Sequence, residues 1–132
     1  MAGHFSVVQG SPNMVELEDT KRHKTDVFGI IEEMTSRAGG AEKASFAKIT
    51  LWTPDKLHRH EMAEETYICL ENEGQIFLDG KIVDFTPGVR VIIEPGTLHA
   101  ARPIKGELVF YCVSSPPFDE KDVYYDRRGR KW

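Results

Sequence analysis

The chain has 132 residues, of which 40% are hydrophobic and 29% charged, and its net charge is −4. These values are typical of a single soluble domain with its own hydrophobic core, and the negative charge argues against a nucleic-acid-binding protein. No apolar run of ~18 residues and no signal peptide is evident, so we expect a cytoplasmic protein that has no membrane partner.

In chain order, the pattern begins with a polar N-terminal arm over residues 1–25, for which a short helix and an extended segment both stay open. Alternating and β-branched runs then predict strands, and Gly, Pro and Asn clusters between them predict turns, among them 72–74 and Lys105-Gly106. The predicted strands are 27–34, 45–52, 65–71, 89–93 and 107–113, with a hairpin over 75–85 that turns at Asp79-Gly80. Short strands at this spacing predict an all-β barrel or sandwich.

The C-terminal arm, residues 116–132, follows the last predicted strand. Its basic cluster, 127–131, is typical of a solvated or partly disordered tail. Its aromatic residues, Tyr124, Tyr125 and Trp132, are expected to close the mouth of the barrel or to pack on a neighbouring chain. Cys69 and Cys112 stand within apolar runs and are predicted to be buried, reduced thiols.

A short stretch, 58–65, carries the most specific chemistry. His58 and His60 are two apart, so on a strand both side chains point to the same side. Residues 61–64 form a turn in this interpretation, and Glu65 then begins a strand face that it shares with Tyr67 and Cys69. Two imidazoles and a carboxylate suit iron, manganese, nickel, copper or zinc. A charged surface turn is the competing interpretation.

A second stretch, 88–103, places a strand, a Pro-Gly turn and then His99 in order. Together the two stretches resemble the two sequence motifs of the cupin family over residues 45–115. The first motif is matched at His58, His60 and Glu65, and the second at Gly88, Gly96 and His99. The departures fall on turn positions of the motifs, namely Trp52, Asn72, Glu94 and Pro103.

The resemblance implies a cupin jelly-roll β-barrel that spans residues 1–132 as one domain, with a homodimer as the expected assembly. It also implies that one divalent transition metal ion (iron, manganese, nickel, zinc or copper) is bound by His58, His60, Glu65 and His99. The motif spacing also permits Glu64 as the acidic ligand, but Glu65 lies at the family's distance from the turn at Asn72.

Several other residues are candidates for the pocket. Tyr67 is a candidate general acid or base, or else a core aromatic residue. The remaining candidates are Lys48 and Thr50 on one strand face, Arg102 as an anion contact at the rim, and Phe110 and Cys112 in the barrel interior. Lys48 faces solvent in the competing interpretation.

The resemblance favours a metal-dependent enzyme that acts on a small organic molecule. Dioxygenase chemistry and lyase or isomerase chemistry are both compatible with the predicted ligands. The alternative is a non-catalytic cupin that binds or senses a small, sugar-like molecule. Neither the metal nor the substrate follows from the residues.

Overall fold

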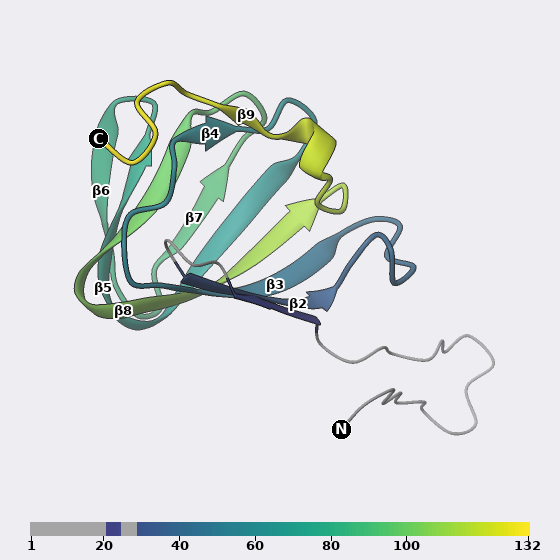
Figure 1. Cartoon of the computed structure of the whole chain (residues 1–132), viewed down its shortest axis with the longest axis horizontal. Coiled ribbons are helices and arrows are strands. Elements are labelled where there is room, and N and C mark those ends of the chain that lie inside the picture. The colour runs from purple at the N-terminus through teal and green to yellow at the C-terminus, as the bar shows by residue number, and fades with distance from the viewer. Residues whose placement is uncertain (1–20, 25–28) are drawn as a thin grey trace.

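The computed structural model describes residues 21–24 and 29–132, and β-strands dominate these ranges (Figure 1). The elements in chain order are β1 (Lys21–Lys24), β2 (Gly29–Thr35), β3 (Ser45–Leu51), β4 (His58–Arg59), β5 (Glu64–Leu78), β6 (Lys81–Phe85), β7 (Arg90–Ile93), β8 (His99–Ser115), the 3₁₀ turn η1 (Glu120–Asp122) and β9 (Tyr124–Tyr125). The all-β prediction is confirmed. Within the same ranges, no helix has the length and apolar character needed to cross a membrane. Most of the predicted N-terminal arm lies outside the described residues.

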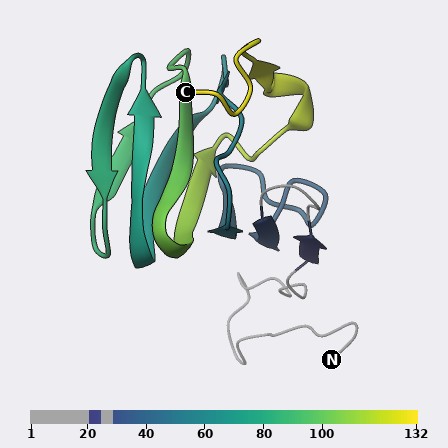
Figure 2. The same cartoon turned by 60° about the vertical axis from the view of Figure 1, so that its left-hand side comes forward.

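Strands β5 and β8 connect the whole fold, because each is long enough to take part in two sheets. The first half of β5 lies between β7 and the second half of β8, and this sheet continues through β3 and β2 to β1. The second half of β5 lies between β6 and the first half of β8, which continues through β4 to β9. The sheet curls so that these two parts face one another across an interior space (Figure 2).

The turns predicted at 72–74 and Lys105-Gly106 are wrong, because β5 and β8 run through both segments. The backbone does take the left-handed conformation there, with φ of 66° at Asn72 and 75° at Gly106. The Asn72 side-chain amide donates to the carbonyl oxygen of Glu107 at 2.7 Å, and the pairing register shifts between Cys69 and Gly74. A bulge bends a strand without ending it. Both long strands therefore bend at the same place and remain paired.

Apolar side chains from both parts of the sheet fill the interior away from the polar end. The most deeply buried of them are 2% exposed or less, and they include Leu51, Ile76, Phe85, Ile93 and Leu108. Cys69 and Cys112 are buried and free, as predicted. This core fixes the relative positions of β3, β5 and β8, which carry much of the wall of the functional site.

The C-terminal strap, residues 116–132, packs on the barrel, and the prediction of a partly disordered tail is wrong. The backbone of Leu57 donates to Gly129 and accepts from Asp126, both at 2.9 Å. Trp132 Nε1 donates to the carbonyl oxygen of Asp55 at 2.9 Å, and its own carbonyl oxygen accepts from Arg102 at 2.8 Å. The basic residues Arg127, Arg128 and Lys131 are exposed, as a solvated segment requires. The backbone contacts explain why this charged segment nevertheless stays on the barrel.

The core can be tested by making one substitution at two positions of the β5–β6 hairpin. Ile76 is 0% exposed and Ile82 is 44% exposed. We expect Ile76→Ala to lower the free energy of unfolding by ~2–5 kcal/mol, because it leaves a cavity among packed side chains. The matched Ile82→Ala should cost less than ~1 kcal/mol. Equal losses in urea denaturation would contradict the assignment of Ile76 to the core.

Candidate functional site

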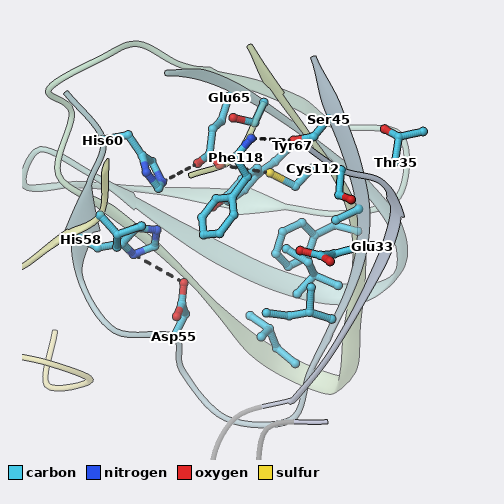
Figure 3. A pocket seen from close by; sticks show the side chains of 18 of the residues that line it. Glu33, Thr35, Ser45, Asp55, His58, His60, Glu65, Tyr67, Cys112 and Phe118 are labelled. Carbon is cyan, nitrogen blue, oxygen red and sulfur yellow. Dashed lines mark hydrogen bonds and ion pairs between the residues drawn. The ribbon is translucent and has the colours of Figure 1, made fainter. Parts of the chain in front are cut away.

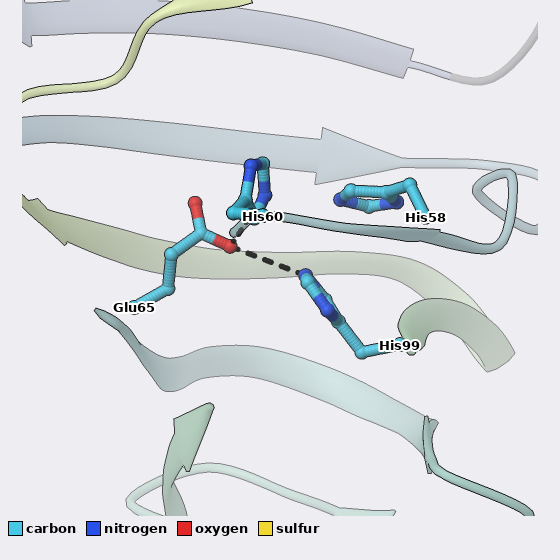
Figure 4. Close-up of side chains that lie close together, drawn as sticks. All are labelled: His58, His60, Glu65 and His99. Atoms are coloured by element: carbon cyan, nitrogen blue, oxygen red, sulfur yellow. Dashed lines mark hydrogen bonds and ion pairs between the residues drawn. The ribbon is translucent and has the colours of Figure 1, made fainter. Parts of the chain in front are cut away.

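Four side chains singled out from the sequence meet at one end of the interior space (Figure 4). His58 lies in β4, His60 follows that strand, Glu65 lies in β5 and His99 is the first residue of β8. One ligand atom from each lies within 4.8 Å of the others, and all four residues are at most 9% exposed. Glu64 is exposed to solvent, so Glu65 is the carboxylate that joins this cluster. The four residues are called the His/Glu cluster below.

The ligands come together across the barrel rather than within a hairpin. Strand β4 ends at Arg59 and, among the strands described, pairs with β8 and β9. His58 is directly opposite His99 in the β4–β8 pair, and their ring centroids are 4.3 Å apart. The chain then crosses at residues 61–63 to reach β5, which brings Glu65 toward the imidazoles from the other part of the sheet.

Backbone carbonyl groups set the tautomer of all three histidines. The Nδ1 atoms of His58, His60 and His99 lie 2.7, 3.0 and 2.8 Å from the carbonyl oxygens of Lys56, Asp122 and Thr97 respectively. A carbonyl oxygen only accepts hydrogen bonds, so each Nδ1 carries the hydrogen. In the neutral imidazoles Nε2 is therefore a lone-pair donor, and orienting contacts of this kind are typical of metal-binding histidines.

The lone pairs of the His/Glu cluster face one another, and this arrangement needs a cation. Glu65 Oε1 lies 3.1 Å from Nε2 of His60 and 3.2 Å from Nε2 of His99. Nε2 of His60 is buried and has no hydrogen-bond partner of good geometry. Two acceptors at this distance repel each other unless a proton or a metal ion lies between them or beside them. Three imidazole nitrogens and a carboxylate oxygen are a donor set that first-row divalent metals accept, so the residues fit a metal ion.

The pKa values reflect the same arrangement. Burial and, to a smaller extent, the neighbouring His99 lower the pKa of His58 to about 4, so His58 is neutral at pH 7. Burial alone would raise the pKa of Glu65, but the neighbouring imidazoles of His60 and His99 outweigh it and hold the pKa well below its ordinary value. The carboxylate in turn raises the pKa of His60 against the effect of burial. A metal ion that binds here displaces any proton held between Glu65 and the imidazoles.

Asp122, on the C-terminal strap, holds the loop between two of the ligands. Its carboxylate accepts hydrogen bonds from the backbone amides of residues 61–63 at 3.0–3.3 Å. Its carbonyl oxygen is the one that accepts from Nδ1 of His60. A single residue therefore fixes the crossing from β4 to β5 and also orients one imidazole.

A cavity of about 310 Å³ opens beside the His/Glu cluster (Figure 3). Its walls are formed by alternate residues of the strands, because successive side chains point to opposite faces. Its lining includes Ile31, Ala47, Ile49, Leu51, Phe110 and Cys112, together with polar side chains that include Glu33, Asp55, His58, His60, Glu65 and Tyr67. The strap contributes Phe118, Val123 and Tyr125.

The predicted pocket residues divide into two groups. Tyr67, Phe110 and Cys112 line the cavity, and the Cys112 thiol donates to Glu65 Oε2 at 3.3 Å. Lys48 and Thr50 are not among the lining residues, since the inward positions of β3 are Ser45, Ala47, Ile49 and Leu51. Arg102 also lies outside the cavity, where its guanidinium group donates to the side-chain oxygen of Gln75. The suggested anion contacts of Lys48 and Arg102 are therefore not made in this cavity.

Two ionisable groups of the cavity have displaced pKa values. Burial raises the pKa of Tyr67 well above its ordinary value, and the charge of Glu65 adds to the effect. Burial also raises the pKa of Asp55 to about 6, although the backbone amide of Lys56 donates to its carboxylate. At neutral pH, Tyr67 is thus a proton donor and Asp55 is a carboxylate that titrates close by.

Asp55, Asp122 and Phe118 are site residues that the sequence pattern did not indicate. Asp55 belongs to a Pro-Asp turn that reads as a strand breaker, and Asp122 lies 62 residues beyond the histidine it orients. No local spacing links such positions. The aromatic residues of the strap were noted as a possible cover for the barrel mouth, and Tyr125 does line the cavity.

One relative was found by sequence. The uncharacterized protein MJ1618 of Methanocaldococcus jannaschii is 34% identical over 112 residues, which is 82% of this chain and 90% of that protein. No family model matches the chain. This identity over most of both chains places the two proteins in one family.

Solved structures show which fold this family has. Oxalate decarboxylase from Bacillus subtilis superposes with a TM-score of 0.71 at 19% identity over 81% of this chain, which spans only 30% of that enzyme. KdgF from Halomonas sp. gives 0.68 at 13% identity, covering 76% of this chain and 90% of its own. The nucleoside dehydratase Pac13 of Streptomyces gives 0.71 at 13% identity, covering 83% and 86%. At these identities the likeness concerns the fold.

The assignment of Glu65 as the carboxylate ligand can be tested by comparing it with Glu64, the neighbouring residue. We expect Glu65→Gln to weaken metal binding by at least ~100-fold, since it removes the one negative charge of the four-residue ligand set. Glu64→Gln removes an exposed carboxylate one position away and should leave the affinity unchanged. Elemental analysis and competition with a chelator measure both effects. Full metal content in Glu65→Gln would contradict the cluster.

The positioning role of Asp122 predicts a smaller loss of metal affinity than the removal of the Glu65 carboxylate. We expect Asp122→Ala to lower metal affinity by roughly tenfold, because His60 loses its fixed loop but remains a ligand. The control is Asp119→Ala, since the Asp119 side chain accepts from the backbone amide of Lys121, whereas the amides of residues 61–63 donate to Asp122. If both variants bind metal alike in chelator competition, Asp122 does not position the site.

Proposed function

The chain belongs to the cupin family, as its resemblance to the two cupin motifs predicted, and on that basis we propose that it is a metal-dependent enzyme. This enzyme transfers protons on a small organic molecule, as a lyase or isomerase does. Its His/Glu cluster fits a metal site. The observation that carries the proposal is the position of a phenol and a carboxylate, Tyr67 and Asp55, in the cavity beside this cluster.

These two residues suit opposite halves of a proton transfer. Asp55, with a pKa of about 6, is mostly ionised at neutral pH and still basic enough to accept a proton. Tyr67 keeps its proton, because its pKa is raised, and can donate it or a hydrogen bond to a developing oxyanion. Pairs of titratable groups with displaced pKa values mark the acid and the base in many active sites.

A bound metal ion would supply a Lewis acid that polarises a substrate oxygen. The chain's own residues do the rest. Tyr67 and Asp55 hold the substrate between them, and the aliphatic wall of Ile31, Ile49 and Leu51 limits the water around it. His58, His60 and His99 keep their Nε2 atoms directed into the site through the three carbonyl contacts.

Dioxygenase chemistry is the second candidate. It is favoured by the apolar cavity wall and by the four-residue ligand set, which leaves positions open on a metal ion that prefers six. A non-catalytic sensor would use the same cavity without turnover. Iron, manganese, nickel, zinc and copper all accept such ligands, so the metal is to be identified by elemental analysis of protein purified without a tag, with His99→Ala as the metal-deficient comparison.

The proton-transfer proposal predicts a loss of turnover when the hydroxyl group of Tyr67 is removed. Metal-loaded protein is incubated in D₂O with a panel of small hydroxy, keto and sugar compounds, and deuterium exchange and elimination products are followed by NMR. An oxygen electrode runs in parallel. We expect turnover without oxygen uptake, and a decrease in kcat of ~100-fold or more in Tyr67→Phe. Tyr111→Phe is the control, because the Tyr111 ring packs on Phe46 and lies outside the cavity.

Each contrary result identifies a different alternative. Oxygen consumption that accompanies product formation and survives in Tyr67→Phe would replace the lyase proposal with a dioxygenase. Saturable binding without turnover of any compound would favour a sensor. Absence of bound metal in the wild type, even after addition of each of the five ions, would overturn the metalloenzyme altogether.

A further inference from the structure

Two aromatic side chains at the cavity mouth are exposed although they stand beside the metal ligands. Phe118 is 44% exposed and Tyr125 is 65% exposed, and both line the cavity. The ring of Phe118 is centred 6.2 Å from that of His60, and the ring of Tyr125 is centred 6.1 Å from that of His58. Figure 3 shows Phe118 directed into the cavity near His60. Large apolar surface that remains exposed in a concave site marks a place for a ligand.

The backbone holds both rings in place. The amide of Phe118 donates to Ser45 Oγ at 2.8 Å, which ties this part of the strap to the start of β3. Tyr125 lies directly opposite His58 in the β4–β9 pair, and Lys56 Nζ is 5.5 Å from the centre of its ring. Because these positions are set before a ligand arrives, little conformational entropy is lost when the rings are covered.

The space that the rings adjoin is small and has an aliphatic wall. The cavity measures about 310 Å³, and Ile31, Ile49 and Leu51 line it. A volume at the lower end of the range for small-molecule sites suits one ring rather than an extended chain. Tyr124, the neighbour of Tyr125, provides a contrast: its ring lies 5.1 Å from the guanidinium of Arg59 and does not line the cavity.

We propose that Phe118 and Tyr125 form an aromatic clamp, and that the substrate is a small ring-bearing molecule with two adjacent oxygen atoms on the edge that faces the His/Glu cluster. The ring is held by aromatic and aliphatic contacts at the mouth. The oxygen pair would face the His/Glu cluster, where a bound metal ion that prefers six ligands would have positions left open by the four residues. This inference rests on the metal-dependent function proposed above and adds the class of substrate.

Two hydroxamates separate the contribution of the ring to binding affinity from that of the chelating group. Benzohydroxamate and acetohydroxamate bind a metal through the same pair of oxygen atoms, but only the first carries a ring. Each is titrated without oxygen into the full-length cobalt(II)-loaded protein, and changes in the visible spectrum give the dissociation constants. Cobalt content is measured beforehand. We expect wild-type protein to bind benzohydroxamate about tenfold more tightly than acetohydroxamate, as contacts with two rings would provide.

The variants assign this preference to the clamp. Phe118→Leu and Tyr125→Leu keep an apolar side chain and should each reduce the benzohydroxamate preference to about threefold or less, with cobalt and acetohydroxamate affinities within about twofold of wild type. Tyr125→Phe keeps the ring and should preserve the preference. Tyr124→Leu is the control, and it should also bind both compounds as the wild type does.

Several outcomes would overturn the clamp. One is an equal affinity of wild-type protein for the two hydroxamates, and another is a preference that persists in both leucine variants. Loss of the preference in Tyr124→Leu as well would show that the strap acts only by stabilising the fold. A concentration-dependent dimer that the two leucine variants abolish, together with no preference for benzohydroxamate, would assign these rings to an interface with a second copy. Failure to bind cobalt would instead overturn the proposed metalloenzyme, and the clamp with it.

Discussion

Three hydrogen bonds from imidazole Nδ1 atoms to backbone carbonyl oxygens determine what the polar end of this barrel can do. Each makes Nε2 a lone-pair donor, and the barrel gathers the three imidazoles around Glu65, with Nε2 of His60 and His99 in contact with its carboxylate. Without a cation such a group of acceptors is electrostatically unfavourable, and with a metal ion it is a complete set of four ligands. The carbonyl groups come from three separate segments, so the site requires the whole fold.

The long paired strands β5 and β8 make this arrangement possible. Because they bend together at Asn72 and Gly106, one pair of strands contributes to both sides of the interior. Glu65 and His99, which lie on different strands, are thereby held at hydrogen-bond distance from one another. The cavity then forms where the apolar core ends and the His/Glu cluster begins, which places Tyr67 and Asp55 beside this cluster.

The sequence was sufficient to predict the all-β fold, the cupin family and the four residues that now meet in the His/Glu cluster. Strand alternation and the two motifs are local signals, and both can be read from neighbouring residues. The prediction from sequence failed at the bends, because Asn72 and Gly106 are residue types typical of turns, yet the strands continue through them. Lys48 and Thr50 were placed on the correct shared face of β3, but which face points inward depends on partners distant in the sequence. The predicted homodimer and cytoplasmic location stay predictions.

The C-terminal strap has a consequence for the order in which the protein is made. Asp122 orients His60 from a position 62 residues later in the chain, and β9 completes the pairing of β4. During synthesis at ~5–20 residues per second, His58, His60, Glu65 and His99 therefore leave the ribosome before the groups that fix two of them. The proposed metal site is therefore complete only after residues 122–125 have been made, so the nascent protein passes through a period in which the four residues of the His/Glu cluster are present but two of them are not yet fixed.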